Sequence, residues 1–242
     1  MIAARQHDED VRARSVLVIE DDVQIRRALQ TALRDTADRV VEASTGAEGI
    51  DLATAERPEI VVLDLGLPDM PGVQVCREIR RWATMPILVL SARHAEDEKV
   101  LLLNAGADDY VTKPFSILEF TARVQAHLRR SRTSAAPASA HLETADGLSI
   151  DFTRRAVARG RDTIRLTPIE WEILQALARQ PGRTLTHQQI FDTVWGRAFG
   201  NPQQYLRVHI TNLRRKIELD SARPRNILTE PGVGYRFEAP PE

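Results

Sequence analysis

Residues 15–130 contain five short apolar runs that alternate with longer segments of helical periodicity, and this alternation narrows the possible folds most. The runs are rich in Val, Ile and Leu, and they lie at 15–20, 39–43, 60–63, 86–90 and 109–112. The segments of helical periodicity lie near 23–34, 46–55, 72–81, 95–105 and 116–129. Short runs of such composition are typical of strands buried on both faces. Five strand–helix units in succession predict an α/β fold with a doubly wound, (βα)5 parallel sheet.

Polar side chains follow four of the five predicted strands, directly where each strand ends. Glu20 and Asp21 follow the first run, Asp64 the third, Ser91 the fourth and Lys113 the fifth. Each of these residues alone is typical of a helix cap or a surface loop. In a parallel sheet, however, the carboxyl ends of the strands meet at one edge, and ligands bind in the crevice there. We therefore expect these five side chains to converge on one site.

The residue types at this edge favour phosphoryl chemistry. Clustered carboxylates repel one another, and a hard divalent cation such as Mg²⁺ (or Mn²⁺) relieves the repulsion through oxygen ligands. Asp64 ends the most apolar run and is the best candidate for a nucleophile that forms an aspartyl phosphate, while Glu20 and Asp21 are better placed to bind the metal. Lys113 would offset charge on the phosphoryl oxygens, and Ser91 would donate its hydroxyl to the attached phosphate.

Charge is distributed unevenly along the 242 residues, although the net charge is only −1. Residues 15–130 carry 14 Lys and Arg against 19 Asp and Glu, a net of −5, whereas residues 142–242 carry 15 against 12, a net of +3. The Ser-, Ala- and Pro-rich segment 131–141 between them is typical of a flexible linker, and residues 1–14 are predicted to form a disordered tail. We therefore expect an acidic and a basic module with different partners.

Composition excludes several classes of protein. The chain is 43% apolar and 28% charged, which is typical of globular proteins and excludes fully disordered, collagen-like and coiled-coil chains. The single cysteine, Cys76, excludes an intramolecular disulfide and a cysteine-based zinc site. No apolar run approaches the roughly 18 residues of a membrane span, and the N-terminus has no signal-peptide core. A cytoplasmic protein is expected.

The second module has the pattern of a winged helix. Thr167 is predicted to cap a helix that has Pro168 at its first position and Glu170 completing a capping box. The predicted helices lie at 168–179, 186–194 and 202–219. Short strand-like stretches lie at 148–152 and 156–158, and a β-hairpin is predicted from 227–230 and 235–237 around Pro-Gly-Val-Gly. Helices followed by a hairpin indicate a winged helix-turn-helix domain of α+β class at 142–242.

The last predicted helix of this module has one apolar and one basic face. Its apolar stripe consists of Leu206, Ile210, Leu213 and Ile217. A helix that is buried on one side and basic on the other fits the major groove, where Arg pairs with guanine and Asn with adenine. An ordinary amphipathic surface helix has the same pattern. The predicted DNA-binding residues are Arg207, Thr211, Asn212, Arg214, Arg215 and Lys216, with Arg236 reaching phosphate or the minor groove from the hairpin.

Residues 15–130 resemble the flavodoxin-like receiver domains of bacterial response regulators. The matching motifs are Val18-Ile19-Glu20-Asp21-Asp22, Leu63-Asp64-Leu65, Leu67-Pro68-Asp69-Met70-Pro71-Gly72, Leu90-Ser91-Ala92 and Gly106-Ala107-Asp108-Asp109-Tyr110-Val111-Thr112-Lys113-Pro114-Phe115. The resemblance implies that a sensor histidine kinase phosphorylates Asp64. It implies that Asp21, Asp64 and the Gly66 carbonyl bind Mg²⁺, with Glu20 holding a metal-bound water.

The same resemblance implies further roles around the phosphorylated residue. Ser91 and Lys113 would contact the phosphoryl group, and Ser91 and Tyr110 would form the switch. A cis peptide bond is expected between Lys113 and Pro114, an isomer that is unusual in folded proteins. Without the motif, Tyr110 is equally typical of a half-buried packing residue.

The two modules together are similar to the OmpR/PhoB family of DNA-binding response regulators. The second module matches at Leu166-Thr167-Pro168-Ile169-Glu170, Val194-Trp195-Gly196, Val208-His209-Ile210, Leu213-Arg214-Arg215-Lys216 and Gly232-Val233-Gly234-Tyr235-Arg236. The family implies a homodimer that forms on phosphorylation through the last receiver helices, binds double-stranded promoter DNA and acts with RNA polymerase. One departure is Glu230-Pro231 before the hairpin glycine, where a basic residue is common, and it would weaken a wing contact.

The family's inter-subunit ion pairs map onto charged residues near the end of the first module. The expected pairs are Lys99 with Glu119, Asp109 with Arg123 and Asp108 with Arg130. The alternative is an ordinary solvated surface, because isolated exposed pairs contribute only about 0–1 kcal/mol. In a symmetric dimer such pairs set the register more than the strength of association.

Three stretches narrow the resemblance to regulators of high-affinity potassium-uptake operons and hence to their partner kinase. They are Tyr205-Leu206-Arg207-Val208, Ala222-Arg223-Pro224-Arg225 and Thr229-Glu230-Pro231-Gly232-Val233-Gly234-Tyr235-Arg236-Phe237. The resemblance implies a phospho-accepting transcriptional regulator that catalyses only its own phosphotransfer and slow dephosphorylation.

Three alternatives to this function stay open. The first is an OmpR/PhoB regulator of another stimulus. The second is a haloacid-dehalogenase-type phosphatase, which also has an aspartate nucleophile but expects Asp-x-Asp where this chain has Gly66. The third is a protein-binding adaptor whose second module does not contact DNA.

Overall fold

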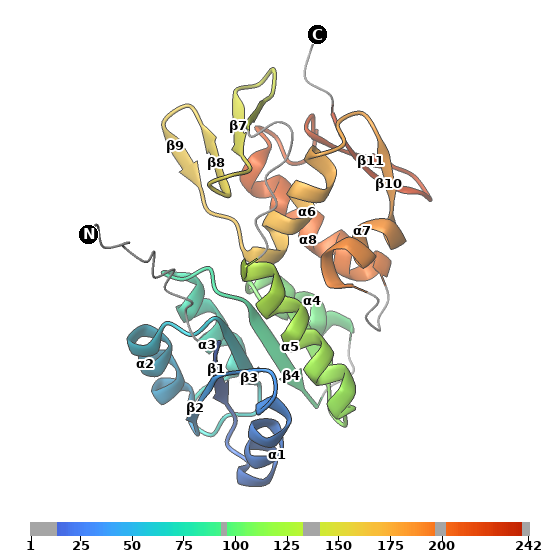
Figure 1. Ribbon diagram of the computed structural model, residues 1–242. Helices are drawn as coiled ribbons and strands as arrows, with labels where there is room; N and C mark the ends of the chain where they lie inside the picture. The colour runs from blue at the N-terminus through green and yellow to red at the C-terminus, as the bar shows by residue number, and fades with distance from the viewer. Residues whose placement is uncertain (1–13, 93–95, 133–140, 197–201, 239–242) are drawn as a thin grey trace, which may run out of the picture.

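The computed structural model describes residues 14–92, 96–132, 141–196 and 202–238. The chain forms two halves that lie against each other, with the N-terminal half in blue to green and the C-terminal half in yellow to red (Figure 1). The helices α4 and α5 of the N-terminal half lie at the boundary between the halves.

The N-terminal half is built on a five-stranded parallel sheet in the order β2-β1-β3-β4-β5. The strands are β1 (Ser15–Ile19), β2 (Arg39–Ala43), β3 (Ile60–Asp64), β4 (Ile87–Ser91) and β5 (Asp109–Thr112). The helices between and after them are α1 (Val23–Leu33), α2 (Gly46–Glu56), α3 (Gly72–Arg80), α4 (Glu96–Asn104) and α5 (Ile117–Arg132). The predicted doubly wound parallel sheet is confirmed.

Strand alternation divides the core of this half into two layers. Leu17 and Ile19 of β1 lie in an apolar cluster with α2, α3 and α4, whereas Val16 and Val18 lie in a second cluster with α1 and α5. Successive side chains of a strand point to opposite faces, so a strand covered by helices on both faces must be apolar throughout. The strand order reverses at β1, whose neighbours are β2 and β3, and this places the predicted crevice at the carboxyl ends of β1 and β3.

The C-terminal half combines two antiparallel sheets with three helices. A four-stranded sheet contains β6 (His141–Glu143), β7 (Leu148–Asp151), β8 (Ala156–Arg159) and β9 (Asp162–Ile164) in sequence order. It precedes α6 (Pro168–Ala178), β10 (Thr184–Thr186), α7 (His187–Trp195) and α8 (Pro202–Ile217). The hairpin of β11 (Ile227–Glu230) and β12 (Gly234–Phe237) pairs with β10 in the order β10-β12-β11. The predicted winged helix-turn-helix fold is confirmed.

Local sequence signals fix both ends of this arrangement. Thr167 and Glu170 form the predicted capping box at the start of α6, which pairs two backbone N–H groups that have no partner within the helix. In the wing, a Cβ atom on Gly234 would lie 1.9 Å from the carbonyl oxygen of Leu185. Only glycine therefore lets β12 approach β10 closely enough to pair.

The structure differs from the sequence-based expectation at several boundaries. Residues 131 and 132 of the predicted linker continue α5, and His141 begins β6, while 133–140 lie outside the described residues. In the predicted tail, the backbone N–H of Arg14 donates to Asp38 at 2.7 Å, and residues 1–13 lie outside the described residues. The short strands β6, β9 and β10 were not predicted, because three-residue strands carry too little periodicity to be distinguished from loops.

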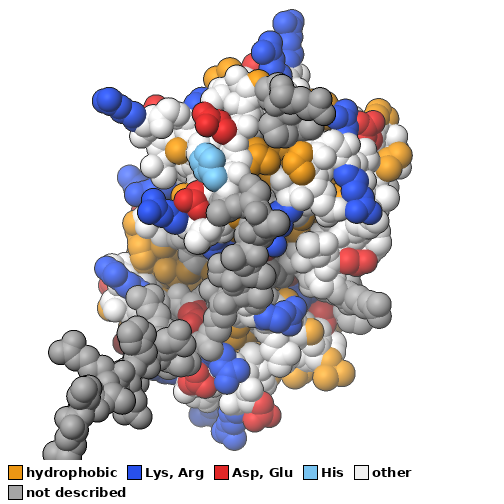
Figure 2. All heavy atoms as spheres, turned by 45° about the horizontal axis from the view of Figure 1, so that its top comes forward, with side chains coloured by type: hydrophobic (Ala, Val, Ile, Leu, Met, Phe, Trp, Pro, Cys, Tyr) orange, Lys and Arg blue, Asp and Glu red, His pale blue; other side chains and the backbone are white. Residues whose placement is uncertain are grey.

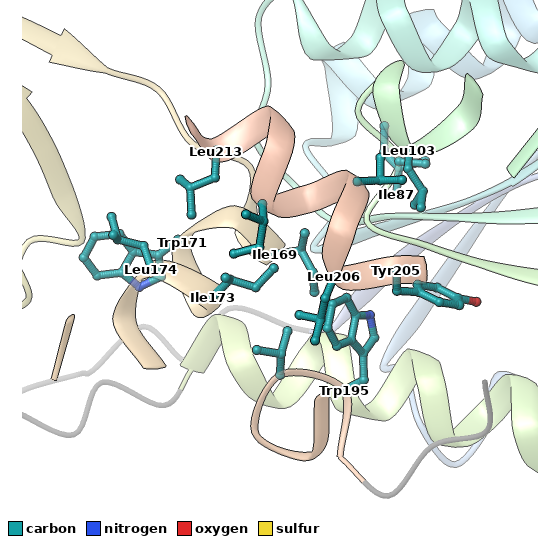
Figure 3. Close-up of a cluster of buried hydrophobic side chains, with 14 of the residues drawn as sticks. Ile87, Leu103, Ile169, Trp171, Ile173, Leu174, Trp195, Tyr205, Leu206 and Leu213 are labelled. Atoms are coloured by element: carbon teal, nitrogen blue, oxygen red, sulfur yellow. The ribbon is translucent and has the colours of Figure 1, made fainter. Parts of the chain in front are cut away.

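One apolar cluster runs through both halves. It includes Leu103 and Ile87 of the N-terminal half together with Ile169 and Tyr205 of the C-terminal half. Figure 3 shows Leu206 and Leu213 of α8 directed toward α6, while Tyr205 lies on the other side of the helix. The halves are thus joined by buried apolar surface as well as by the linker.

Candidate functional site

Three carboxylates meet at the carboxyl edge of the parallel sheet. Glu20 follows β1 directly, Asp21 comes next, and Asp64 is the last residue of β3. One oxygen of each lies within 4.8 Å of the other two. Glu20 and Asp64 are buried, whereas Asp21 is exposed. Burial, assisted by the negative charge of Asp64, raises the pKa of Glu20 above its ordinary value.

The ammonium of Lys113 lies between two of these carboxylates. Its Nζ is 2.6 Å from Asp64 Oδ1 and 2.8 Å from Glu20 Oε2. Burial alone would lower the pKa of Lys113, but the hydrogen bonds to Asp64 and Glu20 outweigh it and raise that pKa. A positive charge is therefore held beside Asp64 throughout the neutral pH range.

Close backbone packing shapes the space around Asp64. The N–H of Gly66 donates to Asp64 Oδ2 at 2.8 Å, and a Cβ atom on Gly72 would lie 2.5 Å from the Asp64 carbonyl oxygen. The N–H of Lys113 donates to the Ser91 carbonyl at 2.6 Å, which holds β4 and β5 in register here. A cavity of about 290 Å³ is lined by Asp64, Gly66, Ser91 and Lys113 among others. The structure thus brings together all the residues predicted at this edge.

The donor set fits a hard divalent cation. Glu20, Asp21 and Asp64 offer carboxylate oxygens, and Gly66 lies two residues beyond Asp64 in the same loop. Mg²⁺ and Mn²⁺ take oxygen ligands, and two added positive charges would relieve the repulsion that raises the Glu20 pKa. Neither a His nor the thiol of Cys76 belongs to this cluster.

The residues implied as a switch lie close to the site and reach the other half of the chain. Ser91 is 3% exposed and Tyr110 is 7% exposed. The Tyr110 ring stacks on the Tyr205 ring of α8, with centroids 4.9 Å apart and planes 3° apart. The Lys113–Pro114 peptide bond is cis, as the resemblance implied.

The residues expected to form inter-subunit ion pairs are engaged within one chain. Arg123 Nη1 lies 2.8 Å from Asp109 Oδ2, and Arg123 Nη2 lies 2.9 Å from Glu119 Oε1. Asp108 is fully buried and pairs with Arg80. Lys99 lies in α4 and Arg130 in α5, but their side chains lie outside the described part of the structure.

The residues predicted to contact DNA divide into exposed and engaged groups. Arg207, Thr211 and Arg215 are exposed on α8. Asn212 donates to the carbonyl of Leu103 in the N-terminal half at 3.3 Å, and Lys216 Nζ lies 2.6 Å from Glu170. On the face shown in Figure 2, the described Lys and Arg side chains lie among acidic and apolar ones.

Two predicted DNA-binding arginines are tied to neighbouring protein groups. The Arg214 guanidinium donates to the carbonyl of Ile227 at 2.6 Å and to the Thr229 hydroxyl at 2.9 Å, which fastens α8 to β11. Burial lowers the pKa of Arg214. Arg236 pairs with Glu230 and Glu238, so the acidic residue before Pro231 occupies the wing arginine.

Sequence reasoning missed three residues that organise these surfaces. Arg80 bonds the carbonyls of Gly106 and Met85 as well as Asp108, and so fixes the loop before β5. Tyr205 stacks on Tyr110, and the exposed Asp69 accepts from the N–H groups of Gly46 and Ala47 at the start of α2. Asp69 lies in the quoted motif and could have been identified as a cap, whereas no local pattern marks Arg80 or Tyr205 as long-range contacts.

Comparisons with known proteins match both halves of the chain. Residues 16–125 match the response regulator receiver domain, and residues 160–237 match the C-terminal domain of transcriptional regulatory proteins. The KDP operon transcriptional regulatory protein KdpE of Escherichia coli is 43% identical over 223 residues, which cover 92% of this chain and 98% of that protein. The transcriptional regulatory protein KdpE of Mycobacterium tuberculosis is 45% identical over 224 residues, covering 93% and 99%.

The chain belongs to the OmpR/PhoB family of response regulators. It is a two-component, DNA-binding response regulator with a receiver domain and a winged-helix domain, and its sequence is similar to KdpE. The structure of a RitR mutant shares this response regulator's fold, with a TM-score of 0.74 at 24% identity, over 93% of this chain and 99% of that chain. Within the described residues, no helix of the regulator combines the length and the hydropathy needed to cross a bilayer.

A buried histidine of the winged-helix domain should make the regulator's stability depend on pH. Burial lowers the pKa of His209 to about 4, although Asp108 and Asp109 act in the opposite direction. Because the unfolded pKa is about 6.5, the stabilising effect of neutral His209 is complete above pH 6.5 and falls as the pH drops toward 4. We expect a loss of about 2 kcal/mol in unfolding free energy between pH 7 and pH 5.

Denaturant titrations of the wild type and of His209→Leu at pH 7 and pH 5 test this expectation. His209 Nε2 has no hydrogen-bond partner among the described residues, so the leucine variant forfeits no polar contact at that atom. Its stability should change less over this pH range than that of the wild type. Equal pH dependence in the two chains would contradict the assignment to His209.

Proposed function

We propose that this response regulator accepts a phosphoryl group on Asp64 from a sensor histidine kinase. The observation that supports it most is the cavity that Asp64 shares with Ser91 and Lys113, in which the Lys113 ammonium lies 2.6 Å from Asp64. A fixed ammonium and hydroxyl beside a carboxylate can stabilise the charge of a transferring phosphoryl group. No second nucleophile is needed, because the product is the acyl phosphate itself.

The residues around Asp64 divide the work of this transfer. An Asp64 oxygen attacks the phosphorus while the bond from phosphorus to the donor's leaving atom breaks. Lys113 neutralises charge on the phosphoryl oxygens, and the Ser91 hydroxyl donates to one of them after transfer. Asp21, Asp64 and the Gly66 carbonyl would bind Mg²⁺, with Glu20 bonding a metal-bound water. When bound, the ion offsets the charge of the incoming phosphate.

Phosphorylated subunits then associate as a two-fold dimer through the α4–β5–α5 face and bind promoter DNA. The residues proposed for the dimer contact are Lys99, Asp108, Asp109, Glu119, Arg123 and Arg130. Arg207, Thr211 and Arg215, which are exposed on α8, are proposed to enter the major groove. Because two winged helices are joined in one dimer, each would raise the effective concentration of the other at neighbouring half-sites.

The similarity to KdpE supports a narrower role in potassium homeostasis. We propose that the chain regulates a potassium-transport (kdp) operon together with RNA polymerase, in the cytoplasm, and that its kinase is KdpD-like. Identity of 43–45% over almost the whole length of the E. coli and M. tuberculosis KdpE proteins supports this role. Binding of the full chain to DNA upstream of such an operon, compared with an unrelated duplex of equal length, tests it.

The phosphorylation experiment uses the full chain with acetyl phosphate and Mg²⁺. Intact mass spectrometry should show a long-lived gain of about 80 Da, the mass of one phosphoryl group, and chelation of the metal should prevent it. Fast turnover of many phosphate esters without a lasting adduct would instead indicate a phosphatase. A chain that neither gains mass nor turns over phosphate would contradict the proposal.

Replacing Arg207 by Ala should weaken binding to specific promoter DNA. The Arg207 side chain is exposed on α8 and free of the wing contacts that hold Arg214. A base or phosphate contact of arginine contributes about 1–3 kcal/mol, which predicts a loss of roughly 5- to 150-fold. Fluorescence anisotropy at several salt concentrations measures both the affinity and its salt dependence.

The matched control is Arg27→Ala, which removes an equally exposed charge from α1 of the receiver domain. This variant should bind DNA as the wild type does. Equal affinities of the Arg207→Ala variant and the control would contradict the proposed placement of α8 in the groove.

A further inference from the structure

The receiver and the winged-helix domain meet on the face formed by α4, β5 and α5. We propose that this face binds the chain's own winged-helix domain through Tyr205, and that this docking excludes a second receiver domain. The inference rests on the proposed function, because that function assigns the same face to the dimer. It makes the docked chain a closed monomer that must open before it can dimerise.

The ring stack between Tyr110 and Tyr205 connects the two domains at the proposed switch. The rings are parallel within 3° at 4.9 Å, and the two residues are 7% and 3% exposed. Tyr205 is also held edge-on by Phe191 and Trp195 of α7. Because its ring is fixed within the winged-helix domain, a rotation of Tyr110 would break the stack.

Polar contacts lie on either side of this stack. The carboxylate of Asp108 accepts from the N–H of Ile169 at 3.2 Å and, through its other oxygen, from the N–H of Ile87 at 2.8 Å. Ile169 lies in the first turn of α6, where backbone N–H groups have no partner within the helix and favour a negative charge. On the other side, Asn212 of α8 donates to the carbonyl of Leu103 at 3.3 Å.

The residues that a second receiver would need are buried in this arrangement. Asp109 is 1% exposed and Arg123 is 4% exposed, and they pair with each other. The Tyr205 side chain lies close enough to Arg123 and Asp109 to interact with both charges. A symmetric dimer through these groups therefore requires that α8 first leave the face.

Docking uses one flank of α8 and leaves another open. Tyr205, His209, Asn212 and Lys216 recur at helical spacing on the flank next to the receiver domain. Arg207, Thr211 and Arg215 lie on the exposed side. Docking should therefore hinder binding of two subunits to paired half-sites more strongly than binding of one subunit to a single half-site.

The closed state predicts a characteristic dependence of dimerisation on the docking equilibrium. Affinity falls by the fraction of chains in the competent state, and both subunits of a dimer must be open. If a variant makes opening easier by some factor, the dimer association constant rises by up to the square of that factor. An aromatic stack corresponds to about a 3- to 10-fold change in such an equilibrium, so a rise of roughly 10- to 100-fold is expected.

The test places Tyr205→Leu in an Asp64→Asn background, so that phosphorylation cannot contribute. Leucine keeps apolar contact with Phe191 and Trp195 but removes the stack. Sedimentation equilibrium should show the 10- to 100-fold stronger dimer, and scattering should show a larger radius for the open monomer. Affinity for a duplex with two half-sites should rise more than affinity for one half-site.

Two further variants keep the test decisive. Tyr205→Phe retains the ring and should behave as the background does. Asn212→Ala removes a contact outside the aromatic cluster, so it tests docking even where Tyr205→Leu fails to fold, and it should also strengthen dimerisation.

The outcomes separate the two proposals. If the folded Tyr205→Leu and Asn212→Ala chains remain as compact and as monomeric as the background, the docking inference is overturned. If acetyl phosphate still phosphorylates and dimerises the wild type in that case, the proposed function stands alone. If the variants dimerise but the wild type accepts no phosphoryl group, docking is supported and the proposed function fails.

Discussion

An Asp64→Asn chain should gain no phosphoryl group from acetyl phosphate and Mg²⁺, while the wild type gains about 80 Da. The amide keeps the size of the side chain, but its oxygen is neutral and a far weaker nucleophile than a carboxylate. It also removes one of the three carboxylates that lie within 4.8 Å of one another. The stimulus-dependent dimer should be lost with it. Intact mass and sedimentation of the full chain measure both effects.

The matched control for this variant is Asp22→Asn. Asp22 lies beside the acidic cluster and caps α1 by accepting from the N–H groups of Gln24 and Ile25. Asparagine caps helices about as well as aspartate, so this chain should fold normally and still be phosphorylated. A mass gain in Asp64→Asn equal to that of the control would rule out Asp64 as the acceptor.

Replacing Arg123 by Ala should lower the unfolding free energy by about 3–5 kcal/mol. Arg123 and Asp109 form a buried ion pair, and removing one partner leaves the other charge buried without compensation. Burial alone would raise the pKa of Asp109, but the Arg123 guanidinium outweighs it and lowers that pKa. In the variant, the Asp109 pKa should rise, so that the loss of stability becomes smaller as the pH falls.

Two controls distinguish the buried charge from lost packing. Arg39→Ala breaks the pair with Glu56 in which the Arg39 side chain is 59% exposed, and such exposed pairs contribute about 0–1 kcal/mol. The double variant Arg123→Leu with Asp109→Leu removes both charges and should recover much of the loss. Urea titrations measure all four chains. A loss below about 1 kcal/mol in Arg123→Ala would contradict the buried pair.

Most of the receiver fold could be predicted because its signals are local. The run at 60–63 contains only Ile, Val and Leu, and β3 is fully buried as predicted, with Asp64 as its final residue. Thr167 and Glu170 marked the start of α6 exactly one residue before Pro168. The site at the carboxyl edge could be predicted for a similar reason: a parallel sheet with five consecutive crossovers leaves few places where strand-end residues can meet.

The sequence by itself determined the two modules, their secondary structure and the residues at the sheet edge, because periodicity, capping and strand-end position act over a few residues. Only the tertiary structure decided that Arg214 fastens α8 to β11, that Asp109 and Arg123 pair within one chain, and that Tyr205 stacks on Tyr110. These contacts join residues far apart or in different domains. Their free energies depend on shape and burial across an interface, which leave no periodic trace in the sequence.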